Sequence, residues 1–350
     1  MTKPLTVGII GCGEITSKRR ADQLEAAAGV QLGAAMDINE AVAADIGERY
    51  DIPYTTEQHE LLAREKIDVV YIATPHHLHA EQAMAAADAD KHVFVEKPIA
   101  VDIESAKETI AACENAGVTL CVCEPYRYKA PYHTAAEIIE AGHLGDVVGT
   151  KISIMARKPE SYWEGGYTGR VQTDWRQSHE KSGGGILSIN GIHNVDAMRA
   201  LTGLEPKRVF AEYDTLATPV EVEDFGIVTI RYEGGEIGYI EASSFVQDGP
   251  YGEVVRGDRV YGTEGELVLS DPLLVRTNET TELGEGEVWH EVPTNDIRPA
   301  GVRLIEAFAD AIREGREPPV PGEDGLRALE VIEAAYEAGR CDNPIELPLY

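Results

Sequence analysis

The strongest constraint on the fold is a regular alternation of strand and helix patterns over the first 124 residues. Short apolar runs, which are typical of buried strands, alternate with amphipathic stretches of helix length. The expected strands are residues 5–10, 30–36, 68–73, 92–95 and 118–123, and the expected helices are residues 15–28, 40–50, 78–89 and 103–116. This alternation predicts an α/β domain over residues 1–124, with a doubly wound parallel sheet covered by helices on both faces.

After residue 124 the pattern changes to strands that alternate apolar and polar residues. The expected strands are residues 147–155, 208–213, 224–232, 236–245, 253–261 and 265–269, and the expected helices are residues 132–141, 192–201, 303–314 and 323–338. Such alternation indicates a large, mostly antiparallel sheet with one open face. We therefore predict a C-terminal α+β domain over residues 125–350. Residues 158–184 are polar, glycine-rich and long for a connector, which suggests a functional loop.

A glycine-rich loop joins the first strand to the first helix, in the order Gly11-Cys12-Gly13-Glu14-Ile15-Thr16. Gly11 permits a tight turn, and Gly13 lets a pyrophosphate approach the backbone beside the positive end of a helix. Thr16 stands where a third small residue is usual, which makes the match weaker. The loop, between a strand and a helix, predicts a dinucleotide site.

Asp37 ends the second strand, 24 residues after Gly13. A carboxylate at this position accepts hydrogen bonds from the adenosine ribose hydroxyls and repels a 2′-phosphate. Ile38 and Asn39 follow it, so no Lys or Arg stands beside it. The sequence therefore favours NAD over NADP. The alternative is an aspartate that only caps the turn.

The fourth strand ends in Glu96-Lys97-Pro98. In a sheet of this type, ligands bind at the carboxyl edge of the strands, which is where Lys97 stands. Its ammonium group could stabilise an alkoxide that forms as a hydroxyl is oxidised. Pro98 permits a cis peptide bond, which would fix a sharp turn. The alternative is a surface lysine in a turn.

In the second domain, Gly183-Gly184-Gly185 precedes Asn190 and His193. Asn190 and His193 are three residues apart, so on a helix they share a face. The glycines would let the backbone approach a ligand closely. A histidine near its ordinary pKa suits proton exchange with a hydroxyl, although a lone histidine on a helix is often structural.

Two groups of residues resemble metal ligands by type. His76, His77 and His79 lie close together, and Cys121 and Cys123 alternate on one expected strand. Their spacing completes no tetrahedral set, and a buried cysteine behaves well as a small hydrophobe. We expect no metal site.

Taken together, these motifs resemble the Gfo/Idh/MocA family, which includes glucose–fructose oxidoreductase and inositol dehydrogenase. The resemblance covers nearly the whole chain and rests on the glycine loop, residues 68–75 with His79, residues 91–98, residues 126–128, Trp175-Arg176, residues 183–185 and residues 191–193. It implies a Rossmann domain paired with an open-faced sheet that makes oligomer contacts. It also implies oxidation of a sugar or cyclitol hydroxyl, or the reverse reaction.

The resemblance implies two catalytic residues, with Lys97 contacting substrate and cofactor and His193 transferring a proton. The residues expected at the cofactor are Gly11, Gly13, Glu14, Ile15, Asp37, Thr74, Pro75, His76, His79, Glu96, Lys97 and Arg176. Those expected at the substrate are Lys97, Arg127, Tyr128, Trp163, Trp175, Asn190 and His193.

The sequence also departs from the family pattern. Ile189 stands where many members carry an aspartate, Asp90 stands where a glycine usually does, and Glu124-Pro125 replaces a more usual pair. A second carboxylate near the substrate is therefore lost. The identity of the substrate cannot be carried over from any one member.

The formal net charge is −30, from 31 basic and 61 acidic residues. The acids are spread over segments that otherwise look folded, which indicates a protein of a high-salt cytoplasm, because salt screens the self-repulsion. The alternative is an acidic enzyme of an ordinary cytoplasm. Nucleic acid and anionic membranes are poor partners for such a surface. No apolar run reaches the length of a membrane span, and the N-terminal residues do not have the pattern of a secretory signal.

The sequence thus predicts an NAD(P)-dependent sugar or polyol dehydrogenase that forms a homodimer or homotetramer through its C-terminal sheet. An aldose oxidised at its anomeric carbon, such as xylose or glucose, is the first expectation, and a ring ketone is the second product considered. Two alternatives stay open. One is a non-catalytic regulator that senses NAD and sugar. The other is a redox-neutral, NAD-dependent lyase or glycosidase.

Overall fold

The computed structural model describes residues 3–246, 257–294 and 298–349. The chain forms two compact units, and neither is continuous in sequence. The first contains Met1–Pro125, Glu160–Gly183 and Arg298–Leu329, and the second contains Tyr126–Pro159, Gly184–Ile297 and Glu330–Tyr350. The chain passes from one unit to the other more than once, and the predicted boundary near residue 124 marks only the first of these passages.

The first unit contains a sheet of six strands in the order β3-β2-β1-β4-β5-β6. The strands are β1 (Leu5–Ile10), β2 (Val30–Met36), β3 (Tyr54–Thr55), β4 (Val69–Ile72), β5 (His92–Glu96) and β6 (Leu120–Cys123). All the neighbouring pairs are parallel, which confirms the predicted Rossmann sheet. The strand that was not predicted, β3, has two residues and is too short to show a pattern.

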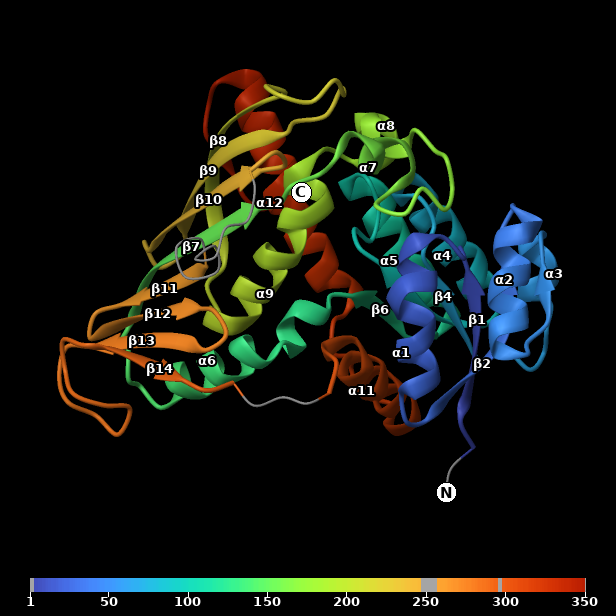
Figure 1. Cartoon of the computed structure of the whole chain (residues 1–350), viewed down its shortest axis with the longest axis horizontal. Helices are drawn as coiled ribbons and strands as arrows, with labels where there is room; N and C mark the ends of the chain where they lie inside the picture. Colours follow the sequence, from blue (N-terminus) through green and yellow to red (C-terminus); the bar gives the residue numbers. More distant parts are fainter. Residues whose placement is uncertain (1–2, 247–256, 295–297, 350) are drawn as a thin grey trace. The chain divides into compact units, whose positions relative to one another are not determined.

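Helices on both faces complete the first unit, and Figure 1 shows α4 and α5 beside the sheet. They are α1 (Ala21–Ala26), α2 (Glu40–Tyr50), α3 (Gln58–Leu62), α4 (His79–Asp88), α5 (Ile103–Ala116) and α11 (Ala300–Glu314). The helix predicted over residues 15–28 is confirmed as one helical run over residues 14–26, in which Thr16–Arg20 is π-helical and is followed by α1. Helix α11 returns from the far end of the sequence, and its Phe308 stacks on Phe94 of β5 at 5.3 Å.

The second unit contains a sheet of nine strands in the order β14-β13-β12-β11-β7-β10-β9-β8-β15. They are β7 (Val147–Met155), β8 (Pro206–Asp214), β9 (Phe225–Tyr232), β10 (Ile237–Ser243), β11 (Asp258–Gly262), β12 (Gly265–Leu269), β13 (Leu273–Thr277), β14 (Trp289–Val292) and β15 (Ile345–Glu346). Strands β7 and β10 pair in parallel, and the other pairs are antiparallel, so the predicted mostly antiparallel sheet is confirmed. Of the strand predicted over residues 253–261, residues 253–256 lie outside the described residues.

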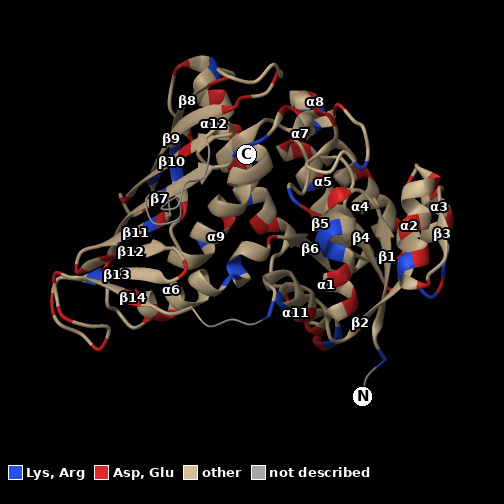
Figure 2. Cartoon of the chain, in the orientation of Figure 1, with Lys and Arg blue, Asp and Glu red and all other residues tan. Residues whose placement is uncertain are grey.

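Helices α6 (Ala130–Glu140) and α9 (Ile192–Thr202) pack against one face of this sheet (Figure 1). Within the described residues, the opposite face carries no helix, as predicted. Helix α12 (Gly322–Cys341) begins in the first unit and ends in the second. Acidic side chains are spread over the helices and loops of both units (Figure 2). Among the helices that are described, none is long and apolar enough to cross a membrane.

Candidate active site

The glycine loop has the geometry that a dinucleotide requires. Gly11 has a φ of 95°, and a Cβ atom there would lie 2.6 Å from the carbonyl oxygen of Ala73, so no other residue fits. A Cβ atom on Gly13 would meet nothing within 4 Å, which leaves the backbone open to a ligand. Thr16 is buried, and its hydroxyl donates to the Gly11 carbonyl at 2.7 Å. The departure at Thr16 therefore stabilises the loop.

Asp37 lies beside this loop and holds it. Its Oδ2 accepts a hydrogen bond from the Cys12 amide at 2.9 Å, and its Oδ1 accepts one from the Asn39 amide at 2.9 Å. The carboxylate thus caps the turn. Each carboxylate oxygen can accept a further hydrogen bond, so the capping role leaves room for a ribose hydroxyl.

Residues 160–183 fold back onto the glycine loop within the first unit. The Glu14 carboxylate accepts a hydrogen bond from the Tyr167 amide at 2.9 Å. Arg170 donates to the Cys12 carbonyl at 3.2 Å and forms an ion pair with Asp45 at 2.7 Å. Arg170 is a cation beside the glycine loop that the sequence alone did not indicate, since it stands 158 residues from Cys12.

Glu96 belongs to a buried polar cluster. Its Oε1 accepts hydrogen bonds from Arg20 at 2.7 Å and from the Tyr71 hydroxyl at 2.9 Å. Arg20 and Glu96 are both buried, so the ion pair fixes the end of β5 against the start of α1. Lys97 follows directly.

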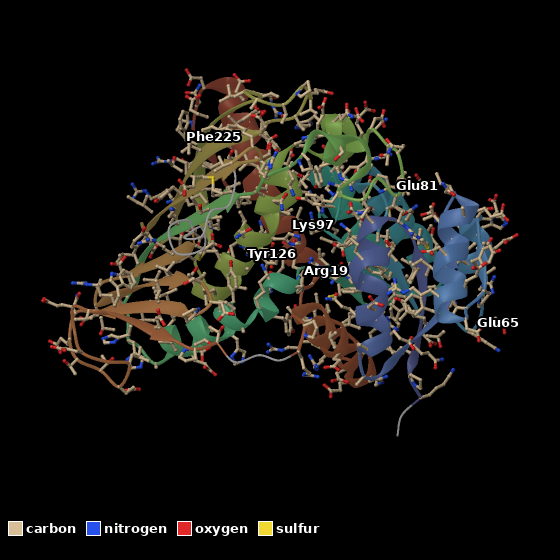
Figure 3. All side chains as sticks on the ribbon, viewed as in Figure 1. Arg19, Glu65, Glu81, Lys97, Tyr126 and Phe225 are labelled. Atoms are coloured by element: carbon tan, nitrogen blue, oxygen red, sulfur yellow. The ribbon has the colours of Figure 1, made fainter. Side chains whose placement is uncertain are left out.

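Lys97, labelled in Figure 3, is half-buried, and its peptide bond to Pro98 is cis. Burial lowers the pKa of its ammonium group below the ordinary lysine value, and the carboxylates of Glu124 and Glu96 oppose this change. Glu124 directly follows β6 and is almost completely buried. Glu124 thus places an acid in the surroundings of Lys97.

Two histidines connect the loops around Lys97. The ring nitrogens of His79 lie 2.7 Å from the Pro98 carbonyl oxygen and 2.9 Å from the Thr74 carbonyl oxygen. The His76 ring lies 4.4 Å from that of Trp175, and its Nδ1 lies 2.7 Å from the carbonyl oxygen of Ser182. Burial lowers the pKa of both histidines. Among the described residues, no group of His, Cys, Asp and Glu could hold a metal ion.

Arg176 is sandwiched by aromatic rings. Its guanidinium lies 4.4 Å from the centre of the Trp175 ring and 5.0 Å from that of Tyr162, a cation–π geometry. Its Nε has no hydrogen-bond partner in the described part of the chain. Trp163, expected at the substrate, is only 1% exposed, and it forms the base of this aromatic group.

In the second unit, Asn190 and His193 are half-buried, whereas Gly191 and Ile192 between them are buried. Both side chains are therefore partly accessible. Tyr126, also labelled in Figure 3, stacks on the His193 ring at 4.6 Å and 11°. Asn190 Oδ1 has no hydrogen-bond partner among the described residues. Ile189, which replaces the usual aspartate, is buried.

Buried acids hold the helix that carries His193. Arg127 binds the buried Asp196 through Nε at 2.7 Å and also through its terminal nitrogen. Asp258 of β11 accepts a hydrogen bond from Asn194 at 2.7 Å. The guanidinium of Arg127, expected at the substrate, is thus engaged with α9. Tyr128 ends the same short 3-10 turn and is half-buried. Asp258 was missed because nothing in the local pattern sets it apart from other strand residues.

Comparison with known proteins agrees with this geometry. The model of a family described as oxidoreductases with an NAD-binding Rossmann fold matches residues 5–124, and the model of the family's C-terminal alpha/beta domain matches residues 136–347. The chain belongs to the Gfo/Idh/MocA oxidoreductase family. It is therefore an oxidoreductase with a nicotinamide-cofactor domain.

Curated relatives include sugar and cyclitol dehydrogenases. The chain is 30% identical to D-xylose 1-dehydrogenase (NADP(+)) 2 of Haloferax volcanii, over 88% of this chain and 90% of the relative. It is also 30% identical to scyllo-inositol 2-dehydrogenase (NAD(+)) of Bacillus subtilis, over 84% and 82%. The crystal structure of aldose-aldose oxidoreductase from Caulobacter crescentus, complexed with glycerol, superposes with a TM-score of 0.83 at 27% identity, covering 99% and 100% of the two chains.

Proposed function

We propose that the chain is an NAD-dependent dehydrogenase that oxidises a hydroxyl group of a pyranose or a cyclitol. The proposal rests on one observation: this member of the family carries two sets of functional residues. One set is the dinucleotide loop with Lys97 at the end of β5, and the other is the partly accessible pair Asn190 and His193. When bound, the nicotinamide ring accepts the hydride.

The remaining steps belong to side chains of this protein. His193 removes the hydroxyl proton, because a half-buried imidazole can exchange a proton near neutral pH. Lys97 stabilises the developing alkoxide by donating a hydrogen bond to it, and its lowered pKa makes its ammonium group a stronger hydrogen-bond donor than that of an ordinary lysine. Asn190 Oδ1 accepts a hydrogen bond from a neighbouring hydroxyl of the ring, which supports a hydroxyl-rich substrate.

NAD is the proposed cofactor. Gly11, Gly13 and the start of the first helix would hold the pyrophosphate, and Asp37 would bind the ribose hydroxyls. The negative charge of Asp37 disfavours a 2′-phosphate. Arg170 does not reverse this preference, because its charge is paired with Asp45.

The substrate is proposed to be an aldose oxidised at its anomeric carbon, with a ring secondary alcohol as the other position considered. The xylose and inositol dehydrogenases among the relatives support both classes. Ile189 removes the carboxylate that many family members place near the substrate. A substrate that can bind without this second carboxylate of the protein is therefore favoured.

The proposed setting is a salty cytoplasm, and the proposed assembly is a homodimer or homotetramer. The acid excess of the whole chain supports the first proposal. For the second, the open face of the sheet exposes Ile227, Ile237 and Tyr239 on the neighbouring strands β9 and β10. Apolar side chains that gather on one face are typical of a subunit interface.

A further inference from the structure

A buried carboxylate, Glu223, lies just before β9, and the proposed chemistry does not use it. The residue is 4% exposed. Its Oε2 accepts a hydrogen bond from the Gly185 amide at 2.6 Å, and its Oε1 accepts one from the Leu187 amide at 2.9 Å. Its backbone carbonyl accepts a third from Ile186 at 3.1 Å. One residue thus binds three successive amides.

These amides open the helical run that leads to His193. Leu187–Gly191 is π-helical and continues directly into α9. The first amides of a helix have no partner inside it, so the carboxyl oxygens of Glu223 supply the acceptors that they lack. Glu223 therefore caps the run from a distant part of the sequence, 36 residues from Leu187.

Tyr336 of α12 completes the anchor. Its hydroxyl donates to Glu223 Oε1 at 3.0 Å, and the backbone of Ser188 also hydrogen-bonds this hydroxyl. The Tyr336 ring is held in turn by an edge contact with Tyr213 at 5.3 Å. A strand, a helix and the glycine segment therefore meet at one carboxylate.

The packing explains two of the three glycines. A Cβ atom on Gly184 would lie 1.9 Å from the Tyr336 hydroxyl, and the φ of Gly184 is 128°. A Cβ atom on Gly185 would lie 1.9 Å from the Glu223 carbonyl oxygen. Any side chain at either position would separate the segment from its anchor. These glycines therefore serve the approach of Glu223 and Tyr336, rather than the approach of a ligand expected from the sequence.

We propose that Glu223 and Tyr336 are positioning residues, which fix the start of the helical run and thereby the direction of the His193 ring. The proposal rests on the proposed role of His193 in proton transfer. Asp196 and Asn194 hold the residues that follow His193, whereas Glu223 holds those that precede it. A shift of the ring by about 1 Å is enough to lower turnover about 100-fold.

The test compares three variants. Glu223→Gln places an amide NH₂ group against a backbone donor, because both carboxylate oxygens accept from backbone amides. Tyr336→Phe removes one hydroxyl and keeps the ring. Glu330→Gln is the matched control: Glu330 is similarly buried in the same unit, and its carboxylate accepts a hydrogen bond from the Leu349 amide at 2.6 Å.

Two readouts are measured on the full chain. Hydrogen exchange of the peptide that covers residues 184–193 reports the anchor without requiring any activity. The effect of the anchor on catalysis is measured as kcat with the sugar that the wild-type protein uses best. NAD affinity is measured on the same variants. We expect faster exchange and a kcat about 10- to 100-fold lower in Glu223→Gln, a smaller effect in Tyr336→Phe, and neither change in Glu330→Gln. NAD affinity should stay at the wild-type value in all three.

Unchanged exchange in Glu223→Gln would overturn the proposal, and so would faster exchange with wild-type kcat. Equal losses in Glu223→Gln and Glu330→Gln would also overturn it, because a general loss of stability would then explain both. If the proposed function is wrong, the wild-type protein will turn over no sugar. This outcome differs from every result that would overturn the positioning role. The exchange readout would still decide whether Glu223 anchors the segment.

Discussion

At the scale of single residues, the proposed chemistry depends on charged groups that the fold buries, although burial of a charge costs free energy. Burial disfavours the ammonium of Lys97, and the carboxylates of Glu96 and Glu124 compensate in part. Glu96 is itself held by Arg20, so the lysine is supported by a network rather than by one ion pair. Strongly perturbed groups of this kind gather at functional sites.

The first prediction concerns Lys97. Lys97→Met keeps much of the side-chain volume and removes the charge, so kcat should fall about 10²- to 10³-fold, the usual effect of losing one donor to a developing oxyanion. NAD affinity, measured by titration calorimetry, should remain. A variant that keeps wild-type kcat would contradict the role of Lys97.

The second prediction concerns Glu223 and pH. Burial raises the pKa of this carboxyl from an ordinary 4.5 to about 7. Because the folded state holds the proton more tightly than the unfolded state, the contribution of Glu223 to stability is complete below pH 4.5. It is lost as the pH rises to about 7. The loss amounts to about 3 kcal/mol, at 1.36 kcal/mol per pKa unit.

Glu223→Gln lacks this titration, whereas every other acid is common to both proteins. The difference in unfolding free energy between wild type and Glu223→Gln should therefore fall by about 3 kcal/mol over this pH range, measured by urea denaturation. A constant difference would show that Glu223 titrates normally.

At the scale of elements, the sequence predicts the strands and helices that have a long, regular pattern of apolar residues. Strands β1, β2, β4, β5 and β6 are apolar runs buried by the fold, and all five were predicted. Strands β13, β14 and β15 were missed because they are short and carry mixed side chains at one end or the other of the sheet. Helix α11 was predicted, but its packing with the first unit was not, because no local pattern records which sheet a helix covers.

The candidate site divides in the same way. Residues within motifs, such as Gly11, Lys97 and His193, could be found from spacing. Residues that act through tertiary contacts could not be found in this way; examples are Glu223, Tyr336 and Arg170. Each contacts a residue more than 100 positions away in the sequence and belongs to no motif of its own. A buried charge is visible only once the fold is known.

The third prediction concerns α9. Asp196→Asn leaves the Arg127 guanidinium without its buried counter-charge, which should lower the free energy of unfolding by about 3–5 kcal/mol. The matched control on the same helix is the ion pair of Arg199 with Glu205, whose carboxylate is more exposed. Glu205→Gln should cost at most about 1 kcal/mol. Equal costs in urea denaturation would contradict the structural role of Asp196.

At the scale of the whole molecule, the net charge of −30 sets the conditions for folding. Unlike the Lys97 network, most of the acids in the described residues are not buried, and there they repel one another and are screened by salt. The acid excess therefore affects stability and its dependence on salt rather than the reaction itself.

The fourth prediction follows from this charge. The melting temperature should rise steadily as KCl is increased from millimolar to molar concentrations, measured by calorimetry, because screening relieves the self-repulsion of the folded state. Light scattering in molar KCl should give the mass of a dimer or tetramer. A melting temperature insensitive to salt would contradict the proposed high-salt setting, and a monomer mass would contradict the proposed assembly.

The most direct test of the central claim is the formation of NADH, followed by its ultraviolet absorbance in molar KCl. The protein is mixed with NAD and, in turn, with aldoses, cyclitols and anhydrosugars. We predict strong NADH formation with at least one aldose or cyclitol, weaker activity with NADP, and no activity in His193→Ala. Tight binding of NAD without NADH formation from any of these compounds would contradict the account and would favour a redox-neutral enzyme or a sensor.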